Sequence, residues 1–306
     1  MIAEFKGVAK WYGEVIGLID VSVEVEPGVT GLLGPNGAGK STFLKLLTGQ
    51  LHPSQGRVRL LGCDPFRSTR VHRQVGFCPE PDAFYEDLTG FQFVRHLTRL
   101  HGFGARDASQ RARTAIERVG LSDVTNRKIR TYSKGMRQRV KLAQAIAHEP
   151  EVLVLDEPLT GMDPVGRRST VELIRELGDK GTTVLVSSHV LHEVEAMTSR
   201  LVLLYRGRVR AVGSLEEIRA HLNDYPHKIL LRSPRARDLA RVLLEQEAVV
   251  AVRLDREHAD LLHVETHAPD ALYEALPELV LEQDLLITGL SAEDLGLDAV
   301  FEYLVS

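Results

Sequence analysis

Hydrophobic and polar residues alternate from the start of the chain to about residue 30, as in the stretch Val21–Glu26. Alternation with a period of two is typical of strands that bury one face, so we expect antiparallel strands here. A turn at Pro27-Gly28 separates them from a short apolar run at Val29–Leu33, which predicts a further strand. Residues 43–47 then carry apolar side chains at helical spacing and predict a helix.

The middle of the chain predicts helices followed by buried strands. Residues 87–150 are mostly helical in pattern, with a further helix expected at Val165–Leu177. Val152–Leu155 and Thr182–Ser188 are nearly continuous apolar runs, which suit parallel strands buried on both faces. A strand pair is expected at Arg200–Ala211. This order predicts an α/β fold.

The pattern changes near residue 223, so we expect one domain over residues 1–222 and an accessory domain over residues 223–306. The sequence pattern of the second domain predicts the order strand, helix, strand, strand, helix, strand, which suits a small α+β unit of ferredoxin-like type. The expected strands are His227–Arg232, Val249–Leu254, Leu261–Thr266 and Leu281–Thr288. The expected helices are Ser233–Glu247, Pro269–Leu276 and a terminal Leu297–Val305.

Residues 34–41 fit the phosphate-loop pattern G-x-x-x-x-G-K-[ST], between a predicted strand and a predicted helix. Three glycines in this loop allow backbone conformations that a side chain forbids: Gly34, Gly37 and Gly39. Backbone N–H groups then converge on phosphate oxygens at a helix N-terminus. Lys40 is expected to reach the β- and γ-phosphates, and Ser41 to ligate Mg²⁺. The alternative is a glycine-rich turn that opens an ordinary helix.

Two carboxylates, Asp156 and Glu157, directly follow the first buried strand. Open α/β sheets bind ligands at the carboxyl ends of their strands. We therefore expect Asp156 to hold Mg²⁺ and Glu157 to orient or polarise a water molecule, the alternative being a surface turn. His189 ends the second buried strand. A lone histidine there is often structural, but its place at the same sheet edge favours a role in the site.

Two polar residues allow an ordinary interpretation beside a functional one. Ser133 precedes an amphipathic helix and is a predicted N-cap. Tyr12 is expected in a loop with Trp11 and Gly13, where its ring either stacks on a nucleobase or packs as a common aromatic.

The composition narrows the class of protein. Charged residues make up 26% and hydrophobic residues 43% of the chain, which is typical of a soluble globular protein. The net charge of −4 gives no general attraction to nucleic acid. No run approaches the roughly 18 apolar residues of a membrane span, and the N-terminus does not have the pattern of a signal peptide. The two cysteines, Cys63 and Cys78, form no metal-binding pattern.

The motifs occur in one order, and over roughly residues 2–220 they resemble the ATP-binding subunit of an ABC transporter. Residues 34–42 resemble the Walker A loop, and residues 152–157 resemble Walker B with its catalytic glutamate. Residues 132–136 stand where the family has its LSGGQ signature. The resemblance implies a P-loop ATPase core of ABC type, with an antiparallel β subdomain and a helical subdomain at about residues 87–150.

Three single residues extend this resemblance. Asp163 resembles the D-loop aspartate, His189 the switch histidine that contacts the γ-phosphate, and Tyr12 the aromatic that stacks on the base. The resemblance implies that ATP contacts most of the Walker A loop, namely Gly34, Asn36, Gly37, Ala38, Gly39, Lys40, Ser41 and Thr42. It also implies hydrolysis with Mg²⁺, in which Lys40, Glu157 and His189 carry the chemistry.

Family members work as dimers that sandwich ATP between Walker A of one subunit and the signature of the other. Ser133 and Gly135 would therefore serve the nucleotide of the partner subunit, in addition to the capping role of Ser133. ATP closes such a dimer, and hydrolysis reopens it and drives an attached membrane permease. The resemblance implies a homodimer, with no nucleic-acid partner, on the cytoplasmic face of the membrane.

The sequence departs from the family pattern at the signature, where Lys134 replaces a glycine and Met136 a glutamine. Glu80 stands where most importers have the Q-loop glutamine, which resembles exporter-type ATPases. A carboxylate there lies near Mg²⁺ and the γ-phosphate, so we expect Glu80 to contact the metal or the nucleotide. The accessory domain also lies beyond the usual core, and by analogy with exporter-type members it serves dimerisation or regulation.

Four aromatic residues follow Glu80 in a region that receives a helix of the membrane subunit in the family: Phe84, Tyr85, Phe91 and Phe93. They are divided between this role and packing inside the helical subdomain. The main rival function is a soluble ABC ATPase that acts on nucleic acid or the ribosome. Such proteins carry a long coiled-coil insertion or two cassettes in one chain, and this chain has neither.

Overall fold

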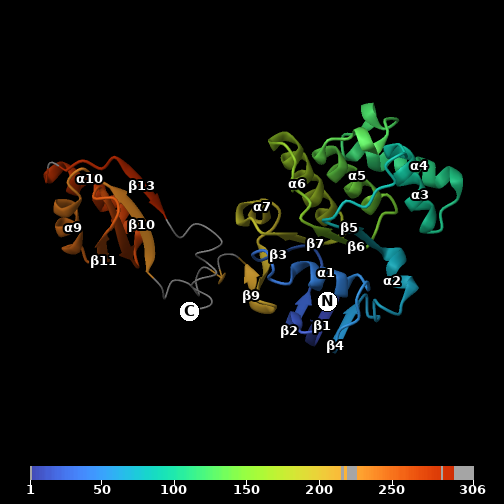
Figure 1. The fold of residues 1–306 in the computed structure, drawn as a ribbon, viewed down its shortest axis with the longest axis horizontal. Coiled ribbons are helices and arrows are strands. Elements are labelled where there is room, and N and C mark those ends of the chain that lie inside the picture. Colours follow the sequence, from blue (N-terminus) through green and yellow to red (C-terminus); the bar gives the residue numbers. More distant parts are fainter. Residues whose placement is uncertain (1, 215–216, 219–225, 284, 293–306) are drawn as a thin grey trace. The chain divides into compact units, whose positions relative to one another are not determined.

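The computed structural model describes residues 2–214, 217–218, 226–283 and 285–292. The chain divides into two compact units, residues 1–215 and 216–306, each of which has its own hydrophobic core (Figure 1). The predicted boundary between residues 222 and 223 lies outside the described residues, as does the predicted helix at Leu297–Val305.

The first unit contains a mixed sheet in the strand order β5-β6-β7-β3-β8-β9. Its strands are parallel except for β9, which is antiparallel to β8. Their bounds are β3 Val29–Leu33, β5 Val75–Cys78, β6 Val152–Asp156, β7 Thr183–Ser188, β8 Arg200–Tyr205 and β9 Arg208–Ser214. The side chains of β6 and β7 are buried along both strands, as their apolar runs predict.

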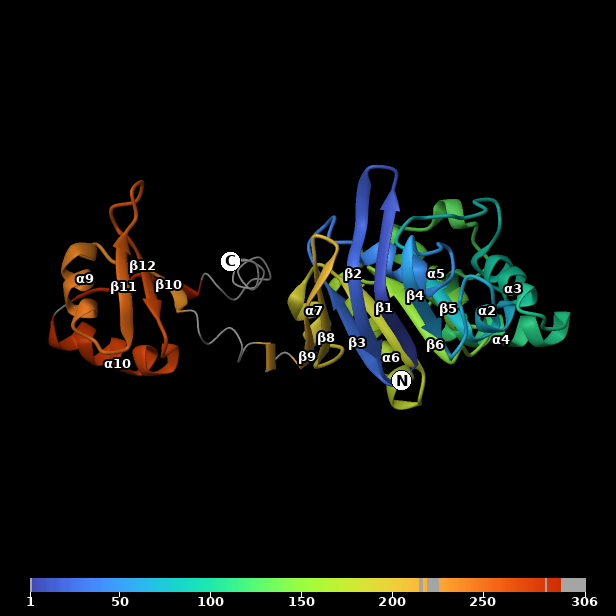
Figure 2. The same ribbon diagram turned by 90° about the horizontal axis from the view of Figure 1, so that it is seen from below.

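A second, antiparallel sheet of the first unit has the order β2-β1-β4 (Figure 2). Its strands are β1 Ala3–Tyr12, β2 Val15–Val25 and β4 Gln55–Leu60. The prediction of a loop at residues 11–13 is wrong for Trp11 and Tyr12, which are the last residues of β1 and pair with β2. Gly13, with a positive φ of 62°, and Glu14 form the turn, and the paired aromatic residues continue the strand up to it.

The helices of the first unit form separate groups. α3 Gly90–Leu100, α4 Ala105–Arg118 and α5 Lys134–Ile146 pack against one another as the predicted helical subdomain (Figure 1). The others are α1 Lys40–Leu47, α2 Thr69–Gln74, α6 Pro164–Asp179 and α7 Leu191–Glu195. Thr89 and Gln92 form a capping box that starts α3, and Ser133 caps α5 by accepting a hydrogen bond from Met136 N (3.3 Å).

Two core clusters hold the first unit together. One joins the helical subdomain and α6 to one set of sheet residues, including Leu153 and Val186. The other joins α1 and the antiparallel sheet to Val154 and Leu185, which alternate with the first pair along the same strands. The central strands are therefore fixed from both faces, and this fixes the positions of their carboxyl ends.

The second unit is an antiparallel sheet in the order β11-β12-β10-β13. Its elements are β10 His227–Arg232, α9 Ala236–Leu244, β11 Val249–Leu254, β12 Leu261–Thr266, α10 Pro269–Glu282 and β13 Gly289–Ala292. This confirms the predicted order of strands and helices, and the strand order is that of a ferredoxin-like unit.

The end of this unit differs from the prediction in two ways. The helix continues through Pro277 to Glu282, because its apolar face continues with Leu272, Leu276 and Leu279 against the core. The apolar run predicted as a strand at residues 281–288 is therefore partly helix and partly connection. Leu285 and Ile287 still pack on the core, but the strand β13 begins only at Gly289.

A pair of stacked histidines lies where the helical subdomain meets the sheet. The rings of His101 and His148 are 3.7 Å apart, and His148 Nε2 is 3.1 Å from the carbonyl oxygen of Val75. Burial, with smaller contributions from the charges of His101 and Arg111, lowers the pKa of His148 to about 4. The unfolded chain therefore binds a proton at this position more readily than the folded chain does below pH 6.5.

This pKa predicts a loss of stability as the pH falls from 7 to 5, of which His148 accounts for about 2 kcal/mol. His148→Gln keeps an amide that can donate to Val75 but does not titrate. Urea denaturation at both pH values should show a smaller loss of unfolding free energy in this variant than in the wild type. The exposed His96→Gln serves as the matched control, and an equal loss in all three proteins would contradict the prediction.

Candidate active site: a phosphate loop against a glutamate and a histidine

The phosphate loop connects β3 to α1, as the sequence predicts. Gly37 and Gly39 have φ angles of 80° and 106°, which residues with a side chain rarely adopt. Gly34 is required for a different reason from the one predicted. Its φ is not positive, but a Cβ atom there would lie 2.4 Å from the carbonyl oxygen of Leu204. The loop is therefore packed directly against the backbone of β8.

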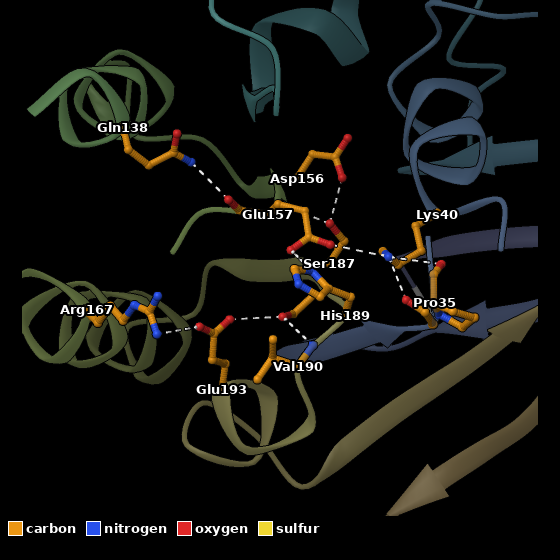
Figure 3. Close-up of polar contacts among 12 residues, drawn as sticks. Pro35, Lys40, Gln138, Asp156, Glu157, Arg167, Ser187, His189, Val190 and Glu193 are labelled. Carbon is orange, nitrogen blue, oxygen red and sulfur yellow. Dashed lines mark hydrogen bonds and ion pairs between the residues drawn. The ribbon is translucent and has the colours of Figure 1, made fainter. Parts of the chain in front are cut away.

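Lys40, the first residue of α1, folds back into the loop (Figure 3). Its Nζ donates to the carbonyl oxygens of Gly34 (2.6 Å) and Pro35 (3.4 Å) and lies 3.3 Å from Glu157 Oε1. Only 7% of each of these two charged side chains is exposed. A buried pair of this kind stabilises the fold only while both partners are present, so either charge alone would be strongly unfavourable.

Ser187, a fully buried residue of β7, joins the two carboxylate residues. Its Oγ donates to Asp156 Oδ1 (2.7 Å) and accepts a hydrogen bond from Glu157 N (2.9 Å). The sequence analysis missed this residue. The signal was a hydroxyl in a strand that is predicted to be buried on both faces, since a buried polar group needs a partner.

Glu157 is held through its backbone as well as its carboxylate. Its φ of 49° is left-handed, which is uncommon for a residue other than glycine. Its carbonyl oxygen accepts a hydrogen bond from Gln138 Nε2 (3.1 Å), and its Oε2 lies 3.0 Å from His189 Nδ1. The two carboxylate oxygens therefore face different partners, Lys40 on one side and His189 on the other (Figure 3).

The turn that carries His189 has its own hydrogen bonds. Ser188 Oγ accepts from Val190 N (3.0 Å) and donates to Glu193 Oε2 (3.0 Å), and Glu193 pairs with Arg167 of α6 at 3.3 Å. These contacts connect the end of β7 to both α6 and α7 (Figure 3). They fix the backbone on each side of the histidine.

Four neighbouring strands deliver the candidate residues to one edge of the sheet. The phosphate loop follows β3, Glu80 comes soon after β5, Glu157 follows β6, and His189 follows β7. A cleft of about 320 Å³ lies at this edge. Its lining includes most of the residues predicted for nucleotide: Tyr12, Asn36, Gly37, Ala38, Gly39, Lys40, Ser41, Thr42, Glu80 and Glu157. Ligands of open α/β sheets bind at such an edge.

Tyr12 lies on the rim of this cleft, with 44% of its surface exposed. Its hydroxyl is 3.3 Å from Thr42 Oγ1, and Lys10 Nζ lies 5.6 Å from the centre of its ring. The strand end thus presents an aromatic ring next to the phosphate loop, which suits stacking on a planar base.

Six predicted residues do not line the cleft. Gly34, Asp156 and His189 each contact or adjoin a residue that does line it, either Lys40 or Glu157. The other three are Ser133, Gly135 and Asp163. Ser133 caps α5, and Asp163 caps α6 by accepting a hydrogen bond from Gly166 N (2.6 Å). They belong to neighbouring segments, since a Cβ atom at Gly135 would lie 3.4 Å from the carbonyl oxygen of Gly161. These residues therefore form a second cluster beside the first.

The side chains at the cleft have the chemistry of a magnesium site that is completed by phosphate and water. Ser41 and Glu80 line the cleft, and the buried Asp156 precedes Glu157. Mg²⁺ is usually bound by one or two carboxylates together with substrate phosphates. Lys141 Nζ donates to the carbonyl oxygen of Glu80 (2.7 Å), which fixes the backbone that carries this carboxylate.

Comparisons with known proteins agree with this geometry. The profile of the ABC transporter family matches residues 18–160. The daunorubicin resistance ATP-binding protein DrrA3 of Streptomyces coeruleorubidus is 35% identical over 305 residues, which cover 97% of this chain and 94% of the relative. The chain belongs to the ATP-binding proteins of ABC transporters. It is therefore an ABC transporter ATPase, as its motifs predict.

Two further matches place it among ABC cassettes. An uncharacterized ABC transporter ATP-binding protein of Synechocystis is 40% identical over 239 residues, covering 76% of this chain and 67% of that protein. The dimeric structure of a bacterial ABC transporter cassette matches with a TM-score of 0.65 at 25% identity, covering 70% of this chain and 99% of the other. The fold of the first unit is thus that of an ABC cassette.

The described part of this ABC protein contains neither a membrane-spanning helix nor a preformed cluster of metal-binding side chains. No helix there combines the length and apolarity that crossing a bilayer requires. The same residues contain no group of three or more histidine, cysteine, aspartate and glutamate side chains arranged to hold a metal ion.

Ser187→Ala should lower the free energy of unfolding by about 2 kcal/mol, because it removes the partner of both Asp156 Oδ1 and Glu157 N in a buried site. Ser169→Ala is the matched control, since that hydroxyl donates to a backbone carbonyl on the exposed face of α6. Urea denaturation would measure both variants. A Ser187→Ala variant as stable as Ser169→Ala would contradict the importance of this bridge.

Proposed function

We propose that this protein hydrolyses ATP with Mg²⁺ and thereby powers transport of a substrate through a separate membrane permease. The observation that carries the proposal is the contact of Glu157 with both Lys40 and His189 at the phosphate loop. A carboxylate in this place can orient an attacking water, while the lysine and histidine stabilise charge on the transferred phosphoryl group.

The residues at the cleft divide the work. Lys40 exchanges its carbonyl partners, Gly34 and Pro35, for the β- and γ-phosphates, and the ring of Tyr12 stacks on the base. Ser41 and Asp156 would hold Mg²⁺, with Glu80 beside them. A bound Mg²⁺ would supply electrostatic stabilisation of the charge that develops on the phosphates. Glu157 then positions the water and His189 contacts the γ-phosphate.

We also propose a homodimer with two composite ATP sites. Ser133, Gly135 and Asp163 lie outside the cleft of their own subunit, which supports their use at the nucleotide of a partner subunit. In a two-fold dimer the same pair of surfaces meets twice, so the interface would hold two equivalent ATP sites. The matched dimeric cassette supports this assembly.

A groove of about 460 Å³ offers a place for the permease. It lies where the helical subdomain meets the sheet and is lined by apolar and polar residues that include Phe77, Ala83, Phe93 and Leu97. A short helix of a membrane protein suits such a groove. Phe93 belongs to the core behind it, whereas Tyr85 is 71% exposed, so the four predicted aromatics are divided between core and surface.

Export is the proposed direction of transport, with the protein bound at the cytoplasmic face of the membrane. Two observations support export. Relatives along nearly the whole chain are named as drug-resistance proteins, and Glu80 takes the place of a glutamine. The accessory domain has a core of its own, and we propose a role for it in dimerisation or regulation.

Co-purification from the native membrane tests this function. Glu157→Gln should bind ATP and hydrolyse it slowly, so it should stay in the ATP-bound state. The variant, trapped with ATP and extracted gently, should carry a polytopic membrane protein in stoichiometric amount. Recovery of ribosomes or nucleic acid without a membrane protein would contradict the proposal.

A second variant links the capture to the groove. Ala83→Arg in the same Glu157→Gln background places a long cation in the groove from an exposed position. It should remove the membrane protein and leave ATP binding unchanged. Capture that is unaffected by this substitution would show that the permease docks elsewhere.

A further inference from the structure

The segment between β6 and α6, residues 157–163, is held from one side by the first two turns of α5. At its start, Gln138 donates to the carbonyl oxygen of Glu157. Near its end, the stem of Lys134 covers Gly161, where an added Cβ atom would lie 2.4 Å from Lys134 Cδ. One helix therefore fixes both ends of the segment that begins with Glu157.

Gln138 is placed to control the backbone of Glu157 in particular. Gln138 is 5% exposed, and its side-chain amide donates to the backbone carbonyl of Glu157 (Figure 3). A left-handed backbone costs energy and persists only where its surroundings fix it. The backbone N–H of Glu157 donates to Ser187, and its carbonyl oxygen accepts from Gln138 Nε2 and, at 3.3 Å, from Thr160 N, so both peptide groups around the residue are held. Gln138 is the side-chain donor to this carbonyl, and it belongs to a different segment of the chain.

We propose that Gln138 is a positioning residue for ATP hydrolysis, one that aligns Glu157 through its backbone carbonyl. The inference rests on the proposed function, in which Glu157 orients the attacking water. It also connects the two clusters of the subunit. Gln138 lies in the helix that Ser133 caps, and Lys134 and Gly135 of the signature contact the same segment, residues 157–163, at Gly161. The placement of the signature segment therefore sets the alignment of Glu157.

The same helix provides a matched control. Gln144 also belongs to α5 and also donates to a backbone carbonyl of the sheet, that of Phe77 at 2.6 Å. It does not touch Glu157. Replacing either glutamine by methionine keeps the length of the side chain and removes its hydrogen bond, so the two variants differ mainly in which carbonyl loses a side-chain donor.

Steady-state hydrolysis of ATP by the purified full chain tests the inference. Gln138→Met should lower kcat by at least about tenfold, because small displacements of a reacting group are costly. The KM for ATP and the affinity for a fluorescent ATP analogue should stay within about twofold of the wild type. Gln144→Met should keep the wild-type kcat. Equal losses of kcat in the two variants, or a rise in the KM for ATP with kcat unchanged, would overturn the inference.

A double-mutant cycle separates positioning from general damage. If Gln138 acts only through Glu157, adding Gln138→Met to Glu157→Gln should cause no further loss in single-turnover hydrolysis. A further tenfold loss would overturn the inference.

The proposed function fails separately, if the wild type does not hydrolyse ATP or if Glu157→Gln keeps the wild-type rate. A wild-type rate in Gln138→Met alone would contradict only the positioning role.

Discussion

The contact of Glu157 with Lys40 and His189 is the interaction on which the rest of the site depends. It joins the phosphate loop after β3, the end of β6 and the turn after β7, so three strands must end in register for it to form. The charges of Lys40 and Glu157 are nearly out of water, so each needs the other, while the half-exposed His189 contacts the second oxygen of Glu157. The contact therefore places a carboxylate between a lysine and a histidine at the position where a loop of phosphate-binding type opens.

The architecture supplies that register. Parallel strands β6, β7 and β3 are neighbours in one sheet, and core clusters on its two faces prevent the strands from sliding. The backbone around Glu157 is then fixed by side chains from a strand and a helix, Ser187 and Gln138. Because the backbone that carries the Glu157 carboxylate is already held, this residue needs little reorganisation when a nucleotide binds. Such preorganisation is the condition for efficient electrostatic stabilisation.

Much of this could be predicted from the sequence. The runs of β6 and β7 predict buried strands, and the loop at residues 34–42 predicts an α1 N-terminus at Lys40, because local patterns determine these features. The role of Gly34 could not be predicted, since it depends on contact with Leu204 of β8, which is far along the chain although it is close in space. Ser187 and Gln138 were missed for a similar reason, because the partners that give each of them its role lie far along the chain.

Hydrolysis of MgATP by the purified chain, compared between wild type, Glu157→Gln and Glu151→Gln, tests the central claim most directly. Glu151 lies just before β6, at its opposite end, and contacts Gln74. The account predicts a loss of about a hundredfold or more in kcat for Glu157→Gln with ATP affinity retained, and a wild-type rate for Glu151→Gln. Hydrolysis by Glu157→Gln at the wild-type rate would contradict the account, because the residue at the centre of the contact would then have no part in the reaction.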